Sequence, residues 1–364
     1  MSDTISAFLR KYRATAVGNT PAQPNIPAAE DDAESDALQR TDRTVECGEA
    51  DWAPQDVGMA LPAPADTPQR FIDGSQTGQP VLCVRSRQGY PVALYLGEVG
   101  AVALRSEGRG FVREFAAVER VLSFVVDPFD WAEIESFARD LMNRPELRLR
   151  VLPANWPQDA HNPFDYEVLR NQARNRCVQE MESLERLAFA QDRSVTALVD
   201  GNIDRVATTP KAHEALIVGV VKTHSTNNLH SQGWQTLLQL EREQRTPVFR
   251  LTTGGTTSTT KISVATWFLK LAGTTRLAPN WGYVRVEIPW VQFTARGADR
   301  FRLVDELSRW LIQARCTTQS YGRMPVSLDP IVRAEDALKP LFTPPVVLVN
   351  RLYRTAGLFR GHES

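Results

Sequence analysis

The chain has 364 residues, enough for one large domain or two ordinary ones, and 42% of them are hydrophobic, so it can bury a sizeable core. Its formal net charge of −1 excludes an overall cationic surface, so any nucleic acid would have to bind in a local groove. Four scattered cysteines without a C-x-x-C pair argue against a zinc ribbon or a disulfide framework. Because no apolar run is long enough to span a bilayer and the first residues lack a signal-peptide core, we expect a cytoplasmic protein without membrane contact.

Residues 1 to 66 are expected to form an N-terminal arm that precedes a folded domain from 67 to 364. The arm begins with a short amphipathic helix at residues 3 to 13, which either docks on a partner or packs on its own domain. Residues 15 to 66 are rich in proline, alanine and acidic residues, a composition typical of an extended or disordered segment.

The folded domain reads as short strands followed by alternating helices and strands. Glycine-containing turns divide the first β-rich region, and residues 121 to 127 are either a strand or a buried helical turn. Strands are expected at 69–75, 80–86, 90–100, 101–107, 193–201, 213–224, 246–253, 262–271 and 282–291. Helices are expected at 131–143, 165–190, 233–244, 298–315 and 328–339. This order predicts an α/β fold in which helices flank a mixed sheet.

Two aspartates follow apolar strands: Asp73 in "FIDGS" and Asp200 in "TALVDG". An acid after a buried strand lies at the carboxyl edge of the sheet, where ligands bind in open α/β sheets. Two such acids and a third from a helix can hold two Mg²⁺ or Mn²⁺ ions, because hard cations prefer oxygen ligands. Two metals about 4 Å apart activate a water and stabilise the leaving oxygen in phosphodiester cleavage. The alternative is that each Asp-Gly pair only marks a turn.

The third acid is expected on the helix before Asp200, where "CVQEMESLERLAFA" offers several glutamates. Glu185 lies near the edge of the apolar face, and Glu182 points further away, so geometry favours Glu185 with Glu182 second. The alternative is that these glutamates are solvated surface residues.

Basic residues and a polar loop follow the second aspartate. Lys222 ends "LIVGVVK" and would either contact a scissile phosphate, reduce the repulsion between the acids, or point into water. His224 and His230 lie beyond it and are weak candidates for leaving-group chemistry. The Gly- and Thr-rich loop at 252–261 lacks the spacing of a phosphate-binding P-loop and is expected to contact a DNA backbone.

Taken in order, several short blocks resemble the NurA nuclease family across about residues 69 to 340. They are "FIDGS", a glutamate-bearing helix, "ALVDG", "GVVK", "TWFLKL" and "YVRVEIP". The resemblance implies an RNase H-like core and Mn²⁺-dependent cleavage of DNA, as a 5′–3′ exonuclease, a single-strand endonuclease or both. It also implies a homodimer that docks on a hexameric HerA-type ATPase and acts in DNA-end processing during repair or anti-phage defence.

Carried over residue by residue, the resemblance assigns roles to named positions. Asp73 and Asp200 match the catalytic, metal-binding aspartates, and the helix acid falls on Glu185 or Glu182. Lys222 matches the lysine of the "VVK" block and is expected to be catalytic and DNA-binding. Arg285 and Glu287 match an R-x-E strand whose role is either structural or DNA-facing. The expected DNA-binding residues are Lys222, Arg285 and Lys261.

One departure concerns the C-terminal block, where the family carries an aromatic residue before a proline and then a metal-binding histidine. Here Met324 precedes Pro325, and the next histidine is His362. The substitutes available are Tyr321, Glu335 and Asp336. If none serves, the chain is a docking or regulatory subunit with weakened catalysis. A phosphatase or nucleotide hydrolase on the same type of core is the remaining hypothesis.

Overall fold

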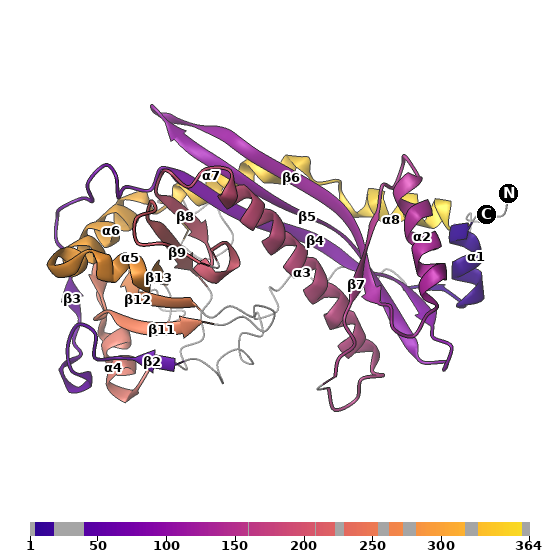
Figure 1. Ribbon diagram of the computed structural model, residues 1–364, viewed down its shortest axis with the longest axis horizontal. Coiled ribbons are helices and arrows are strands. Elements are labelled where there is room, and N and C mark those ends of the chain that lie inside the picture. The colour runs from indigo at the N-terminus through magenta and orange to yellow at the C-terminus, as the bar shows by residue number, and fades with distance from the viewer. Residues whose placement is uncertain are drawn as a thin grey trace.

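The computed structural model describes residues 4–17, 40–158, 160–207, 209–222, 229–253, 262–271, 282–316 and 327–358. These residues form a mixed α/β structure around one large sheet with helices on both faces, which confirms the predicted fold class (Figure 1). In these ranges, no helix is long and apolar enough to span a bilayer.

The helices and strands begin and end as follows. The helices are α1 Thr4–Lys11, α2 Trp131–Asn143, α3 Tyr166–Ala190, α4 Ser231–Gln239, α5 Trp290–Ala295, α6 Arg300–Ala314, α7 Asp329–Leu338 and α8 Pro345–Thr355, with short 3₁₀ turns such as η3 Ile203–Arg205 between them. The strands are β1 Thr15–Ala16, β2 Arg40–Asp42, β3 Gln55–Asp56, β4 Arg70–Arg85, β5 Pro91–Glu107, β6 Gly110–Val125, β7 Arg150–Ala154, β8 Ala197–Asp200, β9 Ile217–Val221, β10 Gln244–Arg245, β11 Phe249–Thr253, β12 Ile262–Lys270 and β13 Tyr283–Pro289.

The main path of the sheet has the strand order β2-β11-β12-β13-β9-β8-β4-β5-β6-β7. At its centre, β4 is parallel to β8, and β8 is parallel to β9. On one side β4, β5 and β6 form an antiparallel meander, and on the other β9 pairs antiparallel with β13. The short strands β8 and β9 therefore lie between β4, which is parallel to them, and β13, which is antiparallel, and the carboxyl end of β8 lies beside β4.

The strands β4 to β6 are longer than the sequence indicated, and they run through the middle of the molecule in Figure 1. The turns expected at their glycines do not form. Gly78 lies directly opposite Gly97, and a Cβ on Gly97 would overlap the carbonyl oxygen of Thr77. These glycines therefore permit a close approach between two paired backbones, a role that a turn pattern does not reveal.

The two faces of the sheet carry different helices. Consecutive strand residues point to opposite faces, so Ile72 and Val199 pack against α3 on one face, together with Leu184 of that helix. Phe71 and Leu198 belong to the core on the other face, which is covered by α6 and α7. In Figure 1, α3 crosses in front of β4 and β5, while α1, α2 and α8 gather at the far end of the long strands.

The described parts of the N-terminal segment, residues 4–17 and 40–66, pack against this body. Helix α1 packs against α2 with Ile5, Phe8 and Leu9 buried, so the amphipathic helix covers its own domain. Within residues 40–66, which the composition placed in an extended arm, β2 pairs with β11, β3 pairs with β10, and Trp52 is buried.

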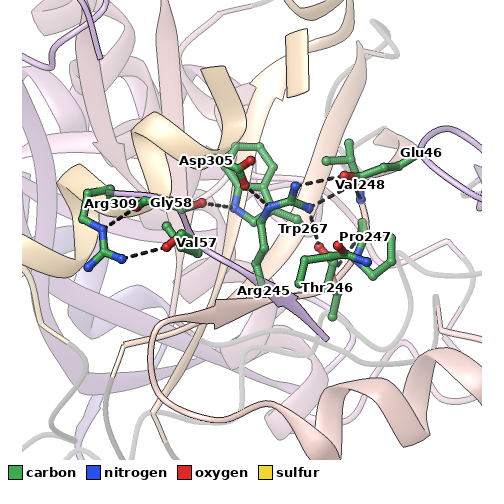
Figure 2. A network of polar contacts seen from close by, with 12 residues as sticks. Glu46, Val57, Gly58, Arg245, Thr246, Pro247, Val248, Trp267, Asp305 and Arg309 are labelled. Carbon is green, nitrogen blue, oxygen red and sulfur yellow. Dashed lines mark hydrogen bonds and ion pairs between the residues drawn. The ribbon is translucent and has the colours of Figure 1, made fainter. Parts of the chain in front are cut away.

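Two arginines of the main body fasten this segment (Figure 2). Arg245 is buried and pairs with Glu46 at 2.9 Å, and Arg309 donates to the carbonyl oxygens of Val57 and Gly58 at 2.7 Å. Composition missed this packing because the segment is rich in proline, alanine and acidic residues and its partners lie far downstream in the chain.

Candidate active site

Asp73 and Asp200 lie side by side on neighbouring parallel strands. The pairing of β4 with β8 ends at Ile72 and Val199, and the two aspartates are the next residue on each strand. Asp200 ends β8 as expected, but the expectation that Asp73 ends its strand is wrong, because β4 continues along β5 to Arg85. Residues at the same level of parallel strands point to the same face, so both carboxylates face the side covered by α7.

Asp73 is the centre of a group of acids. It is 4% exposed, and burial raises the pKa of its carboxyl group well above its ordinary value. The charge of Asp200 raises this pKa further, Lys222 opposes the rise, and Glu335 and Glu185 add to it. Asp73 and these four neighbours are therefore five ionisable groups that lie close enough to interact electrostatically.

Glu185 reaches this group from α3 through a gap that Gly74 leaves. Its side chain is 1% exposed, and a Cβ on Gly74 would lie 2.7 Å from its carboxyl carbon. Burial raises the pKa of Glu185 to about 7; Arg205 lowers it, and the charges of Glu182 and Asp200 raise it. The first Asp-Gly pair is therefore no turn, since its glycine admits a carboxylate. Only the second follows the turn pattern, because Gly201 has a φ of +112°.

The structure distinguishes Glu185 from Glu182, the two helix acids between which the sequence could not choose. Glu185 is buried beside Gly74, whereas the Glu182 side chain is 20% exposed and lies 3.8 Å from the Arg205 guanidinium. Arg205 belongs to the short η3 turn after β8, and it is not part of a sequence motif that would mark it as functional. Its position beside both glutamates comes only from the packing of η3 against α3.

Two further residues complete the group: Lys222, which directly follows β9, and Glu335 of α7. The Lys222 ammonium donates to Asp200 Oδ2 at 2.8 Å and lies 3.9 Å from Glu335 Oε1. Burial acts to lower the pKa of Lys222, but the charges of Asp200, Asp73 and Glu335 together raise it, so the side chain is a cation. Of the three suggested substitutes for a histidine, Glu335 lies in the group, Asp336 pairs with Lys339 on the helix surface, and Tyr321 is outside the described residues.

The remaining predicted residues lie elsewhere or outside the described ranges. Arg285 is buried, and its guanidinium contacts Glu287 at 2.9 Å and the side chain of Asn202 at 3.0 Å. Burial raises the pKa of Glu287, whose carboxylate also accepts from the Ile203 amide. This pair therefore contacts the loop after Asp200. Such contacts support the structural role, one of the two roles that the sequence left open for Arg285 and Glu287.

The three other predicted positions are His230, His224 and Lys261. His230 contacts the carbonyl oxygen of Glu49 and packs on Trp52, within the N-terminal segment. Lys261 and His224 lie outside the described residues.

The donor set fits hard divalent cations. Asp73 Oδ2 and Glu185 Oε2 are buried and have no hydrogen-bond partner among the described residues. A buried carboxylate oxygen without a partner costs free energy, and a bound cation would compensate for that cost. Carboxylate oxygens are the ligands that Mg²⁺ and Mn²⁺ prefer. Where the structure describes the chain, no three His, Cys, Asp or Glu side chains form a ready-made metal group, so an ion would have to draw these carboxylates together.

Comparison with known proteins adds a likeness to solved structures. The sequence matches no family model and no curated protein. Among solved structures, the NurA nuclease from Sulfolobus solfataricus is similar to this chain with a TM-score of 0.42 and 12% identity, over 84% of this chain and 86% of that chain. A likeness of this size does not assign a function, so the functional argument rests on the acidic group itself.

Proposed function

We propose that this protein is a metal-dependent DNA nuclease whose active site is the acidic group around Asp73. The observation that carries the proposal is the pair of buried carboxylate oxygens, on Asp73 and Glu185, that lack a partner beside two further acids and a lysine. Acids whose pKa is raised by burial and by neighbouring acids, as at Asp73 and Glu185, are typical of functional sites, because a structural core gains nothing from such repulsion.

Each residue has a distinct role in this proposal. Asp73, Glu185 and Asp200 hold two Mn²⁺ or Mg²⁺ ions, with Glu335 in place of the expected histidine. When bound, such ions activate a water for attack on phosphorus and stabilise the leaving oxygen. Lys222 neutralises charge on the phosphate.

Further features support the finer parts of the proposal. The order β6-β5-β4-β8-β9, with β4, β8 and β9 parallel and β5 antiparallel to both neighbours, supports an RNase H-like core. The DNA substrate, a HerA-like hexameric ATPase partner, a homodimer and a cytoplasmic setting are supported by the sequence resemblance to NurA nucleases. End processing in repair and in anti-phage defence are both compatible with such an activity.

The test is cleavage of end-labelled linear DNA by the purified full chain, with and without Mn²⁺, ATP and a co-purified HerA-like ATPase. Asp73→Asn is expected to abolish cleavage and to weaken Mn²⁺ binding in calorimetric titrations, with an unchanged circular dichroism spectrum. The matched control is Asp336→Asn, which removes an acid from the exposed face of α7 and is expected to leave both properties intact.

The same experiment separates the rival hypotheses. Normal turnover by Asp73→Asn would refute this site. A wild-type protein that binds its ATPase partner but no Mn²⁺ would be the docking subunit. Hydrolysis of free nucleotides with no cleavage of polymers would indicate the phosphatase.

A further inference from the structure

The acidic group has two halves, of which only one has a lysine in hydrogen-bond contact. On one side, the Lys222 ammonium lies 2.8 Å from Asp200 Oδ2 and 3.9 Å from Glu335 Oε1. On the other side, Asp73 Oδ2 and Glu185 Oε2 are buried and accept no hydrogen bond from the part of the chain that the structure describes. The positive charge of Lys222 is therefore shared by two carboxylates, one from β8 and one from α7.

We propose that Lys222 serves as a built-in counter-ion that takes the place of one of the two divalent ions while no DNA is bound. This inference rests on the proposed nuclease function and concerns the order in which its site fills. The DNA-free protein then binds one divalent ion, which the unpartnered oxygens of Asp73 and Glu185 attract first. Asp200 and Glu335 take part in a second site only when Lys222 leaves them.

The physical reason is charge competition at the same oxygen atoms. A second divalent ion would be repelled by an ammonium group that is already hydrogen-bonded to Asp200, and it would have to displace that group. A phosphate of bound DNA offers the ammonium another anionic partner, and lysine is a flexible cation that can exchange one for the other. The side chain is 25% exposed, so it is accessible to such a phosphate. Loading of the second ion is thus coupled to arrival of the substrate.

The inference is tested by counting Mn²⁺ ions bound to the metal-stripped full chain without DNA, by equilibrium dialysis and calorimetry. The wild type is expected to bind one ion. Lys222→Met, which keeps an unbranched side chain and removes the terminal charge, is expected to bind two. Lys222→Arg keeps the charge and is expected to bind one.

The control is Lys339→Met, which removes the other lysine near Glu335, 3.3 Å from its Oε2 on the surface of α7, and is expected to leave the count at one. Circular dichroism checks that each variant is folded. Two ions in the free wild type, or one in folded Lys222→Met, would overturn the inference and leave the nuclease proposal standing. No Mn²⁺ binding by the wild type would overturn both. Even if Lys222→Met does not fold, two ions bound to the free wild type would still overturn the inference.

Discussion

Glu185→Gln is expected to stabilise the metal-free protein while it abolishes metal binding and cleavage. Glutamine has the same shape as glutamate but carries no charge, so the variant removes only the ionised carboxylate from a buried position. The expected gain follows from the raised pKa of Glu185, which is about 7 in the folded chain against an ordinary 4.5.

The size of the effect depends on pH. A raised carboxyl pKa means that the folded state holds its proton more tightly than the unfolded state. The stabilisation from protonated Glu185 is therefore complete below pH 4.5 and is lost as the pH rises to about 7. At about 1.4 kcal/mol per pKa unit, this loss amounts to roughly 3 kcal/mol.

The assay is thermal unfolding of metal-stripped protein, followed by circular dichroism at pH 5 and pH 8. With an unfolding entropy of about 2.1 cal/mol/K per residue over 364 residues, a gain of about 3 kcal/mol at pH 8 raises Tm by roughly 4 °C. At pH 5 the two proteins are expected to differ much less. At a thousand times its Kd, Mn²⁺ reverses the order, because an ion that binds only the folded wild type then adds about 4 kcal/mol.

The control is Glu182→Gln, which removes a partly exposed acid one turn away and is expected to change neither Tm nor Mn²⁺ binding appreciably. If Glu185→Gln is no more stable than the wild type at pH 8 without metal, the carboxylate is not held unpaired in a buried site, and the reasoning fails.

Three further substitutions test other parts of the structure. Gly74→Ala places a methyl group against Glu185, so we expect loss of cleavage and weaker Mn²⁺ binding in calorimetry, with an unchanged circular dichroism spectrum; full activity would show that the close approach is unimportant. Arg285→Met leaves Glu287 buried and unpaired, which is expected to cost about 3–5 kcal/mol in denaturant unfolding. A loss of DNA affinity at unchanged stability would instead make Arg285 a DNA contact. Trp52→Ala empties a buried site under residues 40–66 and is expected to cost about 3–5 kcal/mol by the same measurement, whereas a free arm predicts no change.

Local patterns predicted the helices better than the strands. Apolar spacing located α2, α3, α6 and α7 to within a few residues, because an amphipathic period over many residues is a strong local signal. The same approach divided β4 and β5 at their glycines and missed β7 and α8. Gly78 and Gly97 read as turns in the sequence, but they face each other across two paired strands.

The sequence by itself determined the α/β class and the short list of acids that follow apolar segments, because both depend on residues adjacent in the chain. Only the tertiary structure decided that Asp73 lies within a long strand, that Glu185 is the buried helix acid, and that Glu335 and Lys222 join the group. These positions follow from the register of β4 with β8 and from the packing of α3 and α7 on opposite faces of the sheet. Contacts between segments so distant in the chain have no local periodicity from which they can be read.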